Sequence, residues 1–169
     1  MFLYNILYIV NNNNGDNMKI EDIMSKDLII GDVNNTVRDI ANKMKEYDIG
    51  FVPIAEDDQI IGVITDRDIV VNILDNNGDL NSSIGSYITR NIVCVEKDQP
   101  IDDAIITMGV EKIKRLLVTD NEEVVGVLSL SDIINAELDN ELIVNNIKKI
   151  WEISRNNDQY NVEIDEFYL

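Results

Sequence analysis

The chain has 169 residues, of which 45% are hydrophobic, and its two prolines and eight glycines suit one globular unit with a buried core. Acidic residues (32) outnumber lysines and arginines (14), and the net charge of -18 disfavours a surface that binds the phosphate backbone of a nucleic acid. Because there is no histidine and only one cysteine, an intrachain disulfide, a Cys/His metal site and the usual base of a serine or cysteine nucleophile are excluded.

Residues 1–17 begin with the apolar stretch MFLYNILYIV and continue with the polar run NNNNGDN. Ten residues are too few to cross a bilayer, and the stretch lacks the basic start and small-residue cleavage site of a secretory signal. We expect a cytoplasmic protein without a membrane partner, whose regular patterning begins at Met18. Residues 1–17 are then an extension outside the fold, either an appended arm or residues upstream of the true start.

The first regular elements are a helix and a hairpin. Val37, Ile40, Met44 and Tyr47 recur at helical spacing, and the apolar runs FVPIA and IIGVI flank the polar turn EDDQ as in a β-hairpin. Pro53 indicates the edge or the start of a strand, because proline cannot donate to a sheet ladder. We expect the order extended segment, helix, strand, turn, strand, helix.

The stretch DNNGDLNSSIGS, residues 75–86, begins like a calcium-binding loop. Its sixth position is Leu80 where such a loop needs glycine, and its twelfth is Ser86 where it needs glutamate. We therefore predict a polar connector and no metal site.

A shift of 64 residues then aligns the second half of the chain with the first without a gap. The shift places Met44 on Met108, and the helix, strand, turn and strand recur with the hairpin turn DNEE. Cys94, in the apolar stretch NIVCV, is expected as a small buried hydrophobe. Repeats of this size cannot bury both faces of their sheets alone, so the two should pack together.

After the second repeat, one helical stripe is formed by Leu142, Ile143, Ile147, Ile150 and Trp151. Such a stripe typically covers a core or a dimer surface rather than a cofactor. The alternating residues that follow suggest an extended tail. The expected divisions are 1–17, repeat 1 over 18–80, repeat 2 over 81–138, and a helix with its tail over 139–169.

Both repeats end in the same polar motif, GVITDRDI at 62–69 and GVLSLSDI at 126–133. A hydroxyl followed three residues later by an acid resembles a helix capping box, although aspartate is shorter than the usual glutamate or glutamine. The same groups could also serve a ligand, because a helix N-terminus and a hydroxyl suit an anion and a carboxylate suits two vicinal ribose hydroxyls. The glycine would then give a ligand access to the backbone. The two interpretations are compatible.

These repeats resemble a pair of CBS domains, the Bateman module, over about residues 20–136. The resemblance implies an α+β fold of two β-α-β-β-α repeats related by a pseudo-two-fold axis, a disc-like homodimer, and adenosyl ligands bound in clefts between the repeats. Such ligands are AMP, ADP, ATP, S-adenosylmethionine, NAD-type molecules and cyclic di-AMP. By this resemblance Asp68 and Asp132 would hold the ribose, and Thr65 and Ser129 would contact ribose or phosphate. The base would be partly enclosed by Ile29, Ile30, Ile92 and Val93.

Each cleft would draw on both repeats, so a cleft at Asp132 would include parts of residues 28–37. Lys114 and Arg115 fall on uncharged counterparts in repeat 1 and resemble the phosphate contacts of nucleotide-binding CBS pairs; Arg67 is a further candidate. The alternative for Arg115 is a solvated charge at a strand end. On this basis we expect the Asp132 cleft to be the stronger phosphate site.

The leading functional hypothesis is a non-enzymatic sensor. It would bind an adenine nucleotide or related adenosyl ligand, change the packing of its homodimer and signal to a protein effector, with no cofactor required. The alternative is a structural or protein-interaction CBS pair with no nucleotide ligand.

Overall fold

The computed structural model describes residues 18–74, 78–136 and 143–150. The expected extension, the tail, Leu142 and Trp151 lie outside these ranges. The described residues contain two three-stranded sheets with helices, so the predicted α+β fold of two repeats is confirmed.

The elements of the two repeats correspond under the predicted shift. Repeat 1 comprises β1 (Gly31–Asp32), α2 (Val37–Glu46), β2 (Phe51–Glu56), β3 (Gln59–Thr65) and α3 (Asp66–Asp68), which continues as a π-helical segment, η1 (Ile69–Leu74). Repeat 2 comprises β4 (Cys94–Glu96), α4 (Ile101–Glu111), β5 (Arg115–Asp120), β6 (Glu123–Ser129) and α5 (Leu130–Asn135). Short helices α1 (Ile20–Ile23) and η2 (Ile84–Ser86) precede the repeats, and residues 143–150 are helical.

Each sheet places a parallel strand beside a hairpin, in the orders β1-β2-β3 and β4-β5-β6. The central turn residues have positive φ in both hairpins, at 49° and 63° for Asp57 and Asp58 and at 52° and 72° for Asn121 and Glu122. Two consecutive residues of this kind make the primed turn that matches strand twist. The hairpins expected around EDDQ and DNEE are confirmed.

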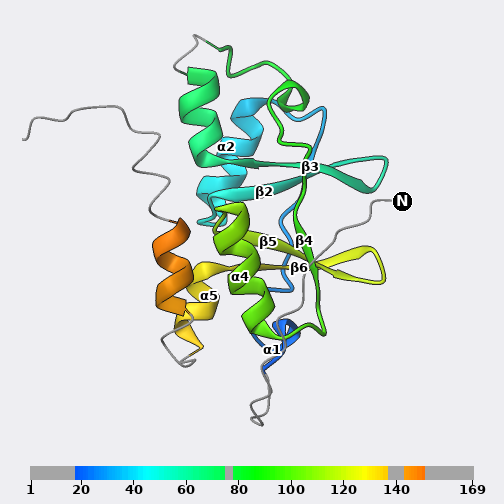
Figure 1. Ribbon diagram of the computed structural model, residues 1–169. Coiled ribbons are helices and arrows are strands. Elements are labelled where there is room, and N and C mark those ends of the chain that lie inside the picture. Colours follow the sequence, from blue (N-terminus) through cyan, green and yellow to red (C-terminus); the bar gives the residue numbers. More distant parts are fainter. Residues whose placement is uncertain (1–17, 75–77, 137–142, 151–169) are drawn as a thin grey trace, which may run out of the picture.

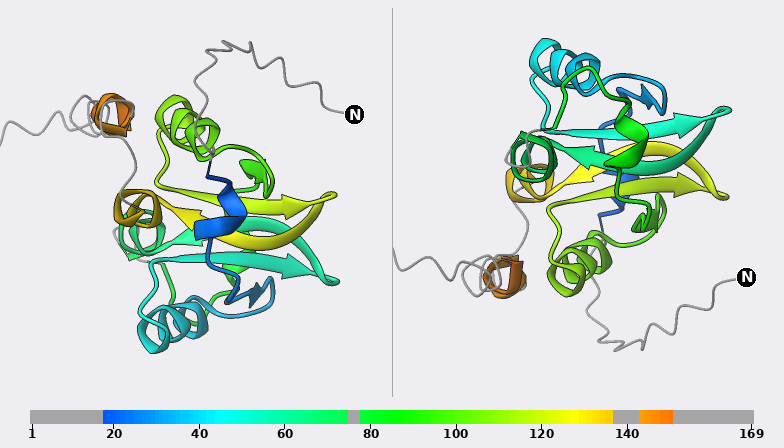
Figure 2. Two further views of the ribbon diagram at one scale, coloured as in Figure 1. Left: turned by 90° about the horizontal axis from the view of Figure 1, so that it is seen from below. Right: turned by 90° about the horizontal axis from the view of Figure 1, so that it is seen from above.

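The two hairpins run side by side with their turns pointing in the same direction (Figure 1). Viewed along the perpendicular direction, α2 and α4 lie on opposite outer sides of the paired hairpins (Figure 2). The repeats thus form one layered body with the hairpins inside, as expected from their small size.

Each repeat's core is completed by residues that precede the other repeat. We call residues 18–25 the N-terminal segment and residues 80–93 the linking segment. Fully buried Ile20, from the N-terminal segment, packs in the core of repeat 2. Fully buried Ile84, from the linking segment, packs in the core of repeat 1. The two repeats therefore exchange their leading segments.

Backbone hydrogen bonds fix this exchange at equivalent places. Ser25 and Val127 exchange N–H···O bonds of 2.9 Å in both directions, and Val63 and Thr89 exchange bonds of 2.9 and 2.8 Å. The glycine of each motif allows the close approach: a Cβ at Gly126 would lie 2.8 Å from the backbone oxygen of Ser25. The segments therefore add a partner to the outer edge of β3 and β6.

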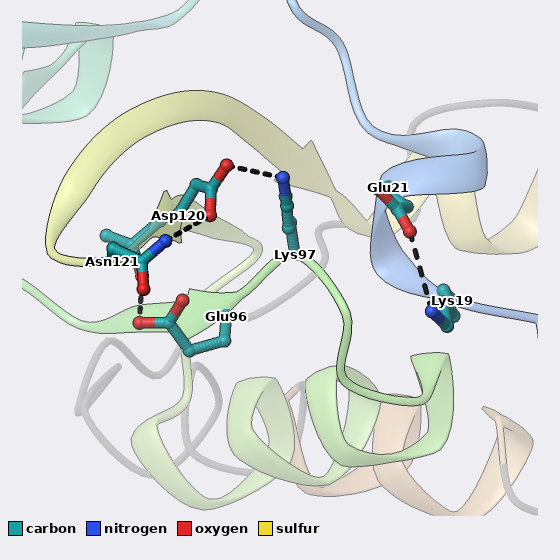
Figure 3. Close-up of polar contacts among 7 residues, drawn as sticks. Lys19, Glu21, Glu96, Lys97, Asp120 and Asn121 are labelled. Atoms are coloured by element: carbon teal, nitrogen blue, oxygen red, sulfur yellow. Dashed lines mark hydrogen bonds and ion pairs between the residues drawn. The ribbon is translucent and has the colours of Figure 1, made fainter.

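The N-terminal segment is also tied to the β4–α4 connection. The N–H of Glu21 donates to the carbonyl of Lys97 at 2.9 Å, and Lys19 pairs with Glu21 at 3.6 Å. Lys97 in turn forms an ion pair with Asp120 of β5 (Figure 3). Its hydrogen bond to this carboxylate raises the pKa of Lys97, which therefore stays charged and joins the segment's anchor to the hairpin.

The prediction that Pro53 marks the edge or start of a sheet strand is wrong, because β2 is the central strand. In repeat 2 the equivalent Leu117 donates its N–H to the carbonyl of Val93 at 3.3 Å, a bond that proline cannot make. β1 comprises only Gly31–Asp32, and its pairing with β2 begins at Ile54. Pro53 is paired with Val63 of β3 but lies just before the stretch of β2 that pairs with β1, so its missing N–H interrupts no bond to β1.

The expectation that Cys94 is buried is also wrong. β4 alternates exposed, buried and exposed residues, and Val95 is the one that enters the core. Although Cys94 is exposed, partial loss of solvation and then the charge of Glu96 raise the pKa of its thiol. It is therefore a protonated thiol at neutral pH.

Gly126→Ala tests the segment exchange. The new methyl group would meet backbone of the N-terminal segment, which cannot swing aside as a side-chain tip could, and Gly62→Ala would meet the Thr89 oxygen at 2.9 Å. We expect each change to lower the free energy of unfolding by about 1–3 kcal/mol in urea denaturation. Gln59→Ala, at an exposed position of β3, is the control and should have little effect. Unchanged stability in both glycine variants would contradict the close approach.

Candidate functional site

A cavity of about 620 Å³ lies between the two repeats, and we call it the Asp68 cleft. Its volume is within the range of small-molecule sites. Its walls come from repeat 1, the linking segment, repeat 2 and helix 143–150. The lining residues are Phe51, Val63, Thr65, Asp66, Arg67, Asp68, Thr89, Asn91, Ile92, Val93, Lys112, Ile113, Lys114, Arg115, Leu117 and Ile150.

The repeated motif forms a capping box in both copies, so the capping interpretation is confirmed. The hydroxyl of Thr65 accepts from the N–H of Asp68 at 3.2 Å, while Oδ2 of Asp68 accepts from the N–H of Thr65 at 2.9 Å. The same pair of bonds between Ser129 and Asp132 measures 3.2 and 2.7 Å. Each hydroxyl also donates to the same carboxylate oxygen at 2.6 Å. Aspartate is thus long enough to close the box.

Capping leaves the carboxylate of Asp68 with capacity for a ligand. The bonds of the box converge on Oδ2, and Oδ1 accepts one bond of 3.3 Å from the side chain of Asn72. An ionised carboxylate offers about four acceptor positions. The cap and a contact to ribose hydroxyls therefore do not compete for the same lone pairs.

Four cationic side chains line the Asp68 cleft: Arg67, Lys112, Lys114 and Arg115. Lys114 and Arg115, which the sequence analysis assigned to the Asp132 cleft, thus also line the cavity at the first motif. Arg115 pairs with Ser129 of the second motif across β5 and β6. However, Phe51 at the start of β2 and Arg115 at the start of β5 line the same cavity, so repeat 2 supplies its charge to the motif of repeat 1.

The apolar part of the cleft combines Ile92 and Val93 of the linking segment with Val63 and Leu117 of the two hairpins. The glycine of the motif has a different role from the one expected. A Cβ at Gly62 would meet the side chain of Ile88 and the backbone oxygen of Thr89, each at 2.9 Å. Gly62 therefore admits the linking segment, which then forms the wall, and does not open the backbone to a ligand.

The cavity unites seven of the predicted site residues and leaves four apart. Those it unites are Thr65, Arg67, Asp68, Ile92, Val93, Lys114 and Arg115; those it leaves apart are Ile29, Ile30, Ser129 and Asp132.

Nine of the sixteen lining residues were not predicted as site residues, and two of the nine had a weak signal in the sequence. Phe51 is the repeat 1 counterpart of Arg115, and Lys112 belongs to the same basic run as Lys114. Ile150 was predicted only to cover a core or dimer surface, and its stripe alone does not reveal that it reaches the cleft.

In the described part of the chain, no three Cys, Asp or Glu side chains are grouped so that they could hold a metal ion. The helices within the described ranges include none that is long and apolar enough to cross a membrane.

Comparison with known proteins matches the profile of the CBS domain to residues 20–75 and 84–139. The Bacillus subtilis protein YlbB is 31% identical over 125 residues, which cover 73% of this chain and 84% of that protein. Inosine-5'-monophosphate dehydrogenase of Methanocaldococcus jannaschii is 28% identical over 118 residues, 69% of this chain and 23% of the enzyme. The solved CBS domain pair of protein MJ0100, in complex with 5'-methylthioadenosine and S-adenosyl-L-methionine, has a TM-score of 0.65 and 28% identity, covering 70% of this chain and 94% of that one.

Substitutions at Asp132 test the capping role by itself. Asp132→Ala removes the acceptor for the N–H and hydroxyl of Ser129 and should lower the free energy of unfolding by about 1 kcal/mol. Asp132→Asn keeps one side-chain oxygen that can accept from the N–H of Ser129, so its free energy of unfolding should fall by less. Thermal denaturation of both variants beside the wild type measures the difference. Equal losses would show that the charge of Asp132, and not its acceptor geometry, stabilises the helix start.

Proposed function

The chain belongs to the CBS-domain family, and on that premise we propose that it is a non-enzymatic regulatory module that binds an adenosyl compound in the Asp68 cleft. The supporting observation is that one cavity brings the Thr65–Asp68 motif of repeat 1 together with Ile92, Val93 and Arg115 of the second half. A nucleoside phosphate can be bound by such a set of groups: a hydroxyl, a carboxylate, an apolar wall and a cation.

Each part of the ligand has a partner of suitable chemistry. The carboxylate of Asp68 accepts from the two ribose hydroxyls, and the base packs against Ile92 and Val93. Arg115, with Lys114 and Lys112, contacts a phosphate or carboxylate group of the ligand. In a chain of net charge -18, the described lining of this cavity has four cations against the two carboxylates of Asp66 and Asp68, and this local positive excess favours an anionic ligand.

Two of the similar proteins support this assignment. The CBS domain pair of MJ0100 was solved with two adenosyl compounds, and it resembles this chain over 94% of its own length. The dehydrogenase contains a matching stretch that is a minor part of a longer enzyme, which supports a module able to operate beside a different protein. We infer that this module likewise transmits ligand binding to a protein effector.

The second motif provides a weaker site in the same proposal. Ser129 and Asp132 present the same arrangement of hydroxyl and carboxylate as the first motif. Ile29 and Ile30 are the counterparts of Ile92 and Val93 under a shift of 63 residues, one less than that of the motif. Because the basic residues line the Asp68 cleft, we expect the Asp132 cleft to favour ligands with less negative charge.

A homodimer is the third part of the proposal. Several helical side chains are apolar and exposed: Val70, Val71 and Leu74 of η1, Ile106 and Val110 of α4, and Ile134 of α5. Such side chains gain by packing against a second copy. Light scattering at physiological ionic strength should give twice the mass of one chain. A mass of one chain at every concentration would contradict the dimer and leave the ligand proposal standing.

Asp68→Asn tests the ribose contact. Loss of a charged acceptor worth about 1.5–3 kcal/mol should lower affinity at least about tenfold. Calorimetry with AMP, ADP, ATP, S-adenosylmethionine, NADH and cyclic di-AMP identifies the tightest ligand for the wild type, which is then titrated into the variant. Binding of none of these compounds to the wild type would overturn the sensor and favour a protein-interaction module. Wild-type affinity in Asp68→Asn would overturn the ribose contact.

Arg115→Ala tests the phosphate contact. We expect the affinity for AMP to fall about tenfold or more and the affinity for adenosine to change little, because only AMP carries the charge that the guanidinium contacts. Arg90→Ala is the matched control, since Arg90 is exposed and is not a lining residue of the cleft. Equal losses for AMP and adenosine would show that Arg115 acts on the structure of the cleft instead.

A further inference from the structure

Helix 143–150 lies outside the residues that match the CBS domain, yet it packs against repeat 2. In Figure 1 it is the orange helix beside α4 and α5. Ile143 and Ile150 are 7% and 2% exposed and belong to the core cluster of that repeat. The helix is therefore docked through an apolar face, as its stripe predicted.

A glycine in α4 marks the docking site. Gly109 is buried within the helix, where glycine is less favourable than alanine. A Cβ at this position would lie 2.8 Å from Oδ1 and 3.2 Å from Cβ of Asn146. The equivalent residue of repeat 1 is Lys45, which is exposed. Gly109 thus permits a close helix approach that repeat 1 does not need.

A buried polar side chain lies at this contact. Asn146 is 2% exposed, and its Oδ1 accepts from Nζ of Lys149 at 3.2 Å. This bond lies within the helix and satisfies the buried amide oxygen. The close approach of Asn146 to Gly109 is therefore the contact that fits the helix to α4.

Ile150 connects this position to the cleft. It is the one described residue of helix 143–150 that lines the Asp68 cleft, and it belongs at the same time to the core of repeat 2. We propose that docking of helix 143–150, which contributes Ile150 to the wall of the ligand site, and binding of an adenosyl compound stabilise one another. The proposal rests on the proposed function of the cleft.

Coupling of this kind is reciprocal. If a docked Ile150 improves ligand affinity, a bound ligand improves docking of the helix by the same factor. Because the helix follows the second repeat in sequence, its docking would carry the state of the cleft to whatever partner contacts that region. The effect can be measured from both directions.

Gly109→Leu measures the effect of docking on binding. The larger side chain would displace Asn146 and the helix, and we expect affinity for the tightest compound of the panel above to fall about fivefold or more. Lys45→Leu is the matched control, because it places the same side chain at the equivalent exposed position of repeat 1, and its affinity should equal that of the wild type. Circular dichroism checks that both variants are folded. Equal affinities in the two variants would overturn the coupling between this helix and the ligand site while leaving the proposed function intact.

Hydrogen exchange on the wild type measures the effect of binding on docking. Saturation with the same compound should slow exchange of the amides of residues 143–150, and Asp68→Asn protein under the same conditions should show no such change. Exchange that is unaltered by a compound bound in the cleft would overturn the coupling.

If Gly109→Leu does not fold, the ligand affinities of Ile150→Ala and Ile143→Ala are compared instead. Both remove the same volume from one helix, and only Ile150 lines the cleft, so only Ile150→Ala should also weaken binding directly. If both weaken it equally, Ile150 is not a wall of the site. If no compound of the panel binds the wild type, the proposed function fails and this inference fails with it.

Discussion

The mutual exchange of leading segments is the constraint on which the rest of the structure depends. Each repeat presents an incomplete core, and the missing side chain, Ile20 or Ile84, comes from the segment that leads into the other repeat. The exchange requires two backbones to meet at Gly62 and Gly126, where any Cβ would collide with the incoming chain. Neither repeat is therefore complete without the other, and the interface between them is as fixed as a core.

That fixed interface creates the cleft. After bonding to β3 at Thr89, the linking segment continues as the wall formed by Asn91, Ile92 and Val93. The start of β5 brings its cations to the same place. The wall formed by the linking segment is held by the bonds between Val63 and Thr89, which also join the repeats. The cleft thus brings groups from both halves of the chain to one cavity.

Local features of the fold were predictable from sequence because they depend on near neighbours. The capping boxes at Thr65 and Ser129 and the two hairpins follow from residues within a few positions of each other. The expectations that were wrong concern Pro53 and Cys94, and the sequence did not indicate that Arg115 also lines the cavity of the first motif. Each depends on which strand lies beside another or how far the pairing extends, and a single sequence does not contain that information. Ile150 was not predicted to line the cleft for the same reason.

The bridge between Ser25 and Val127 joins residues roughly a hundred positions apart, so closing this loop is slow compared with forming the local hairpins. During synthesis, repeat 1 can complete its core as soon as Ile84 has left the ribosome. The N-terminal segment, although made earlier, must wait for its partners in repeat 2, from Lys97 to Val127. The first described residues of the chain are thus incorporated only after repeat 1 is complete, and until then apolar Ile20 stays exposed, so that chaperone binding or aggregation can compete with folding.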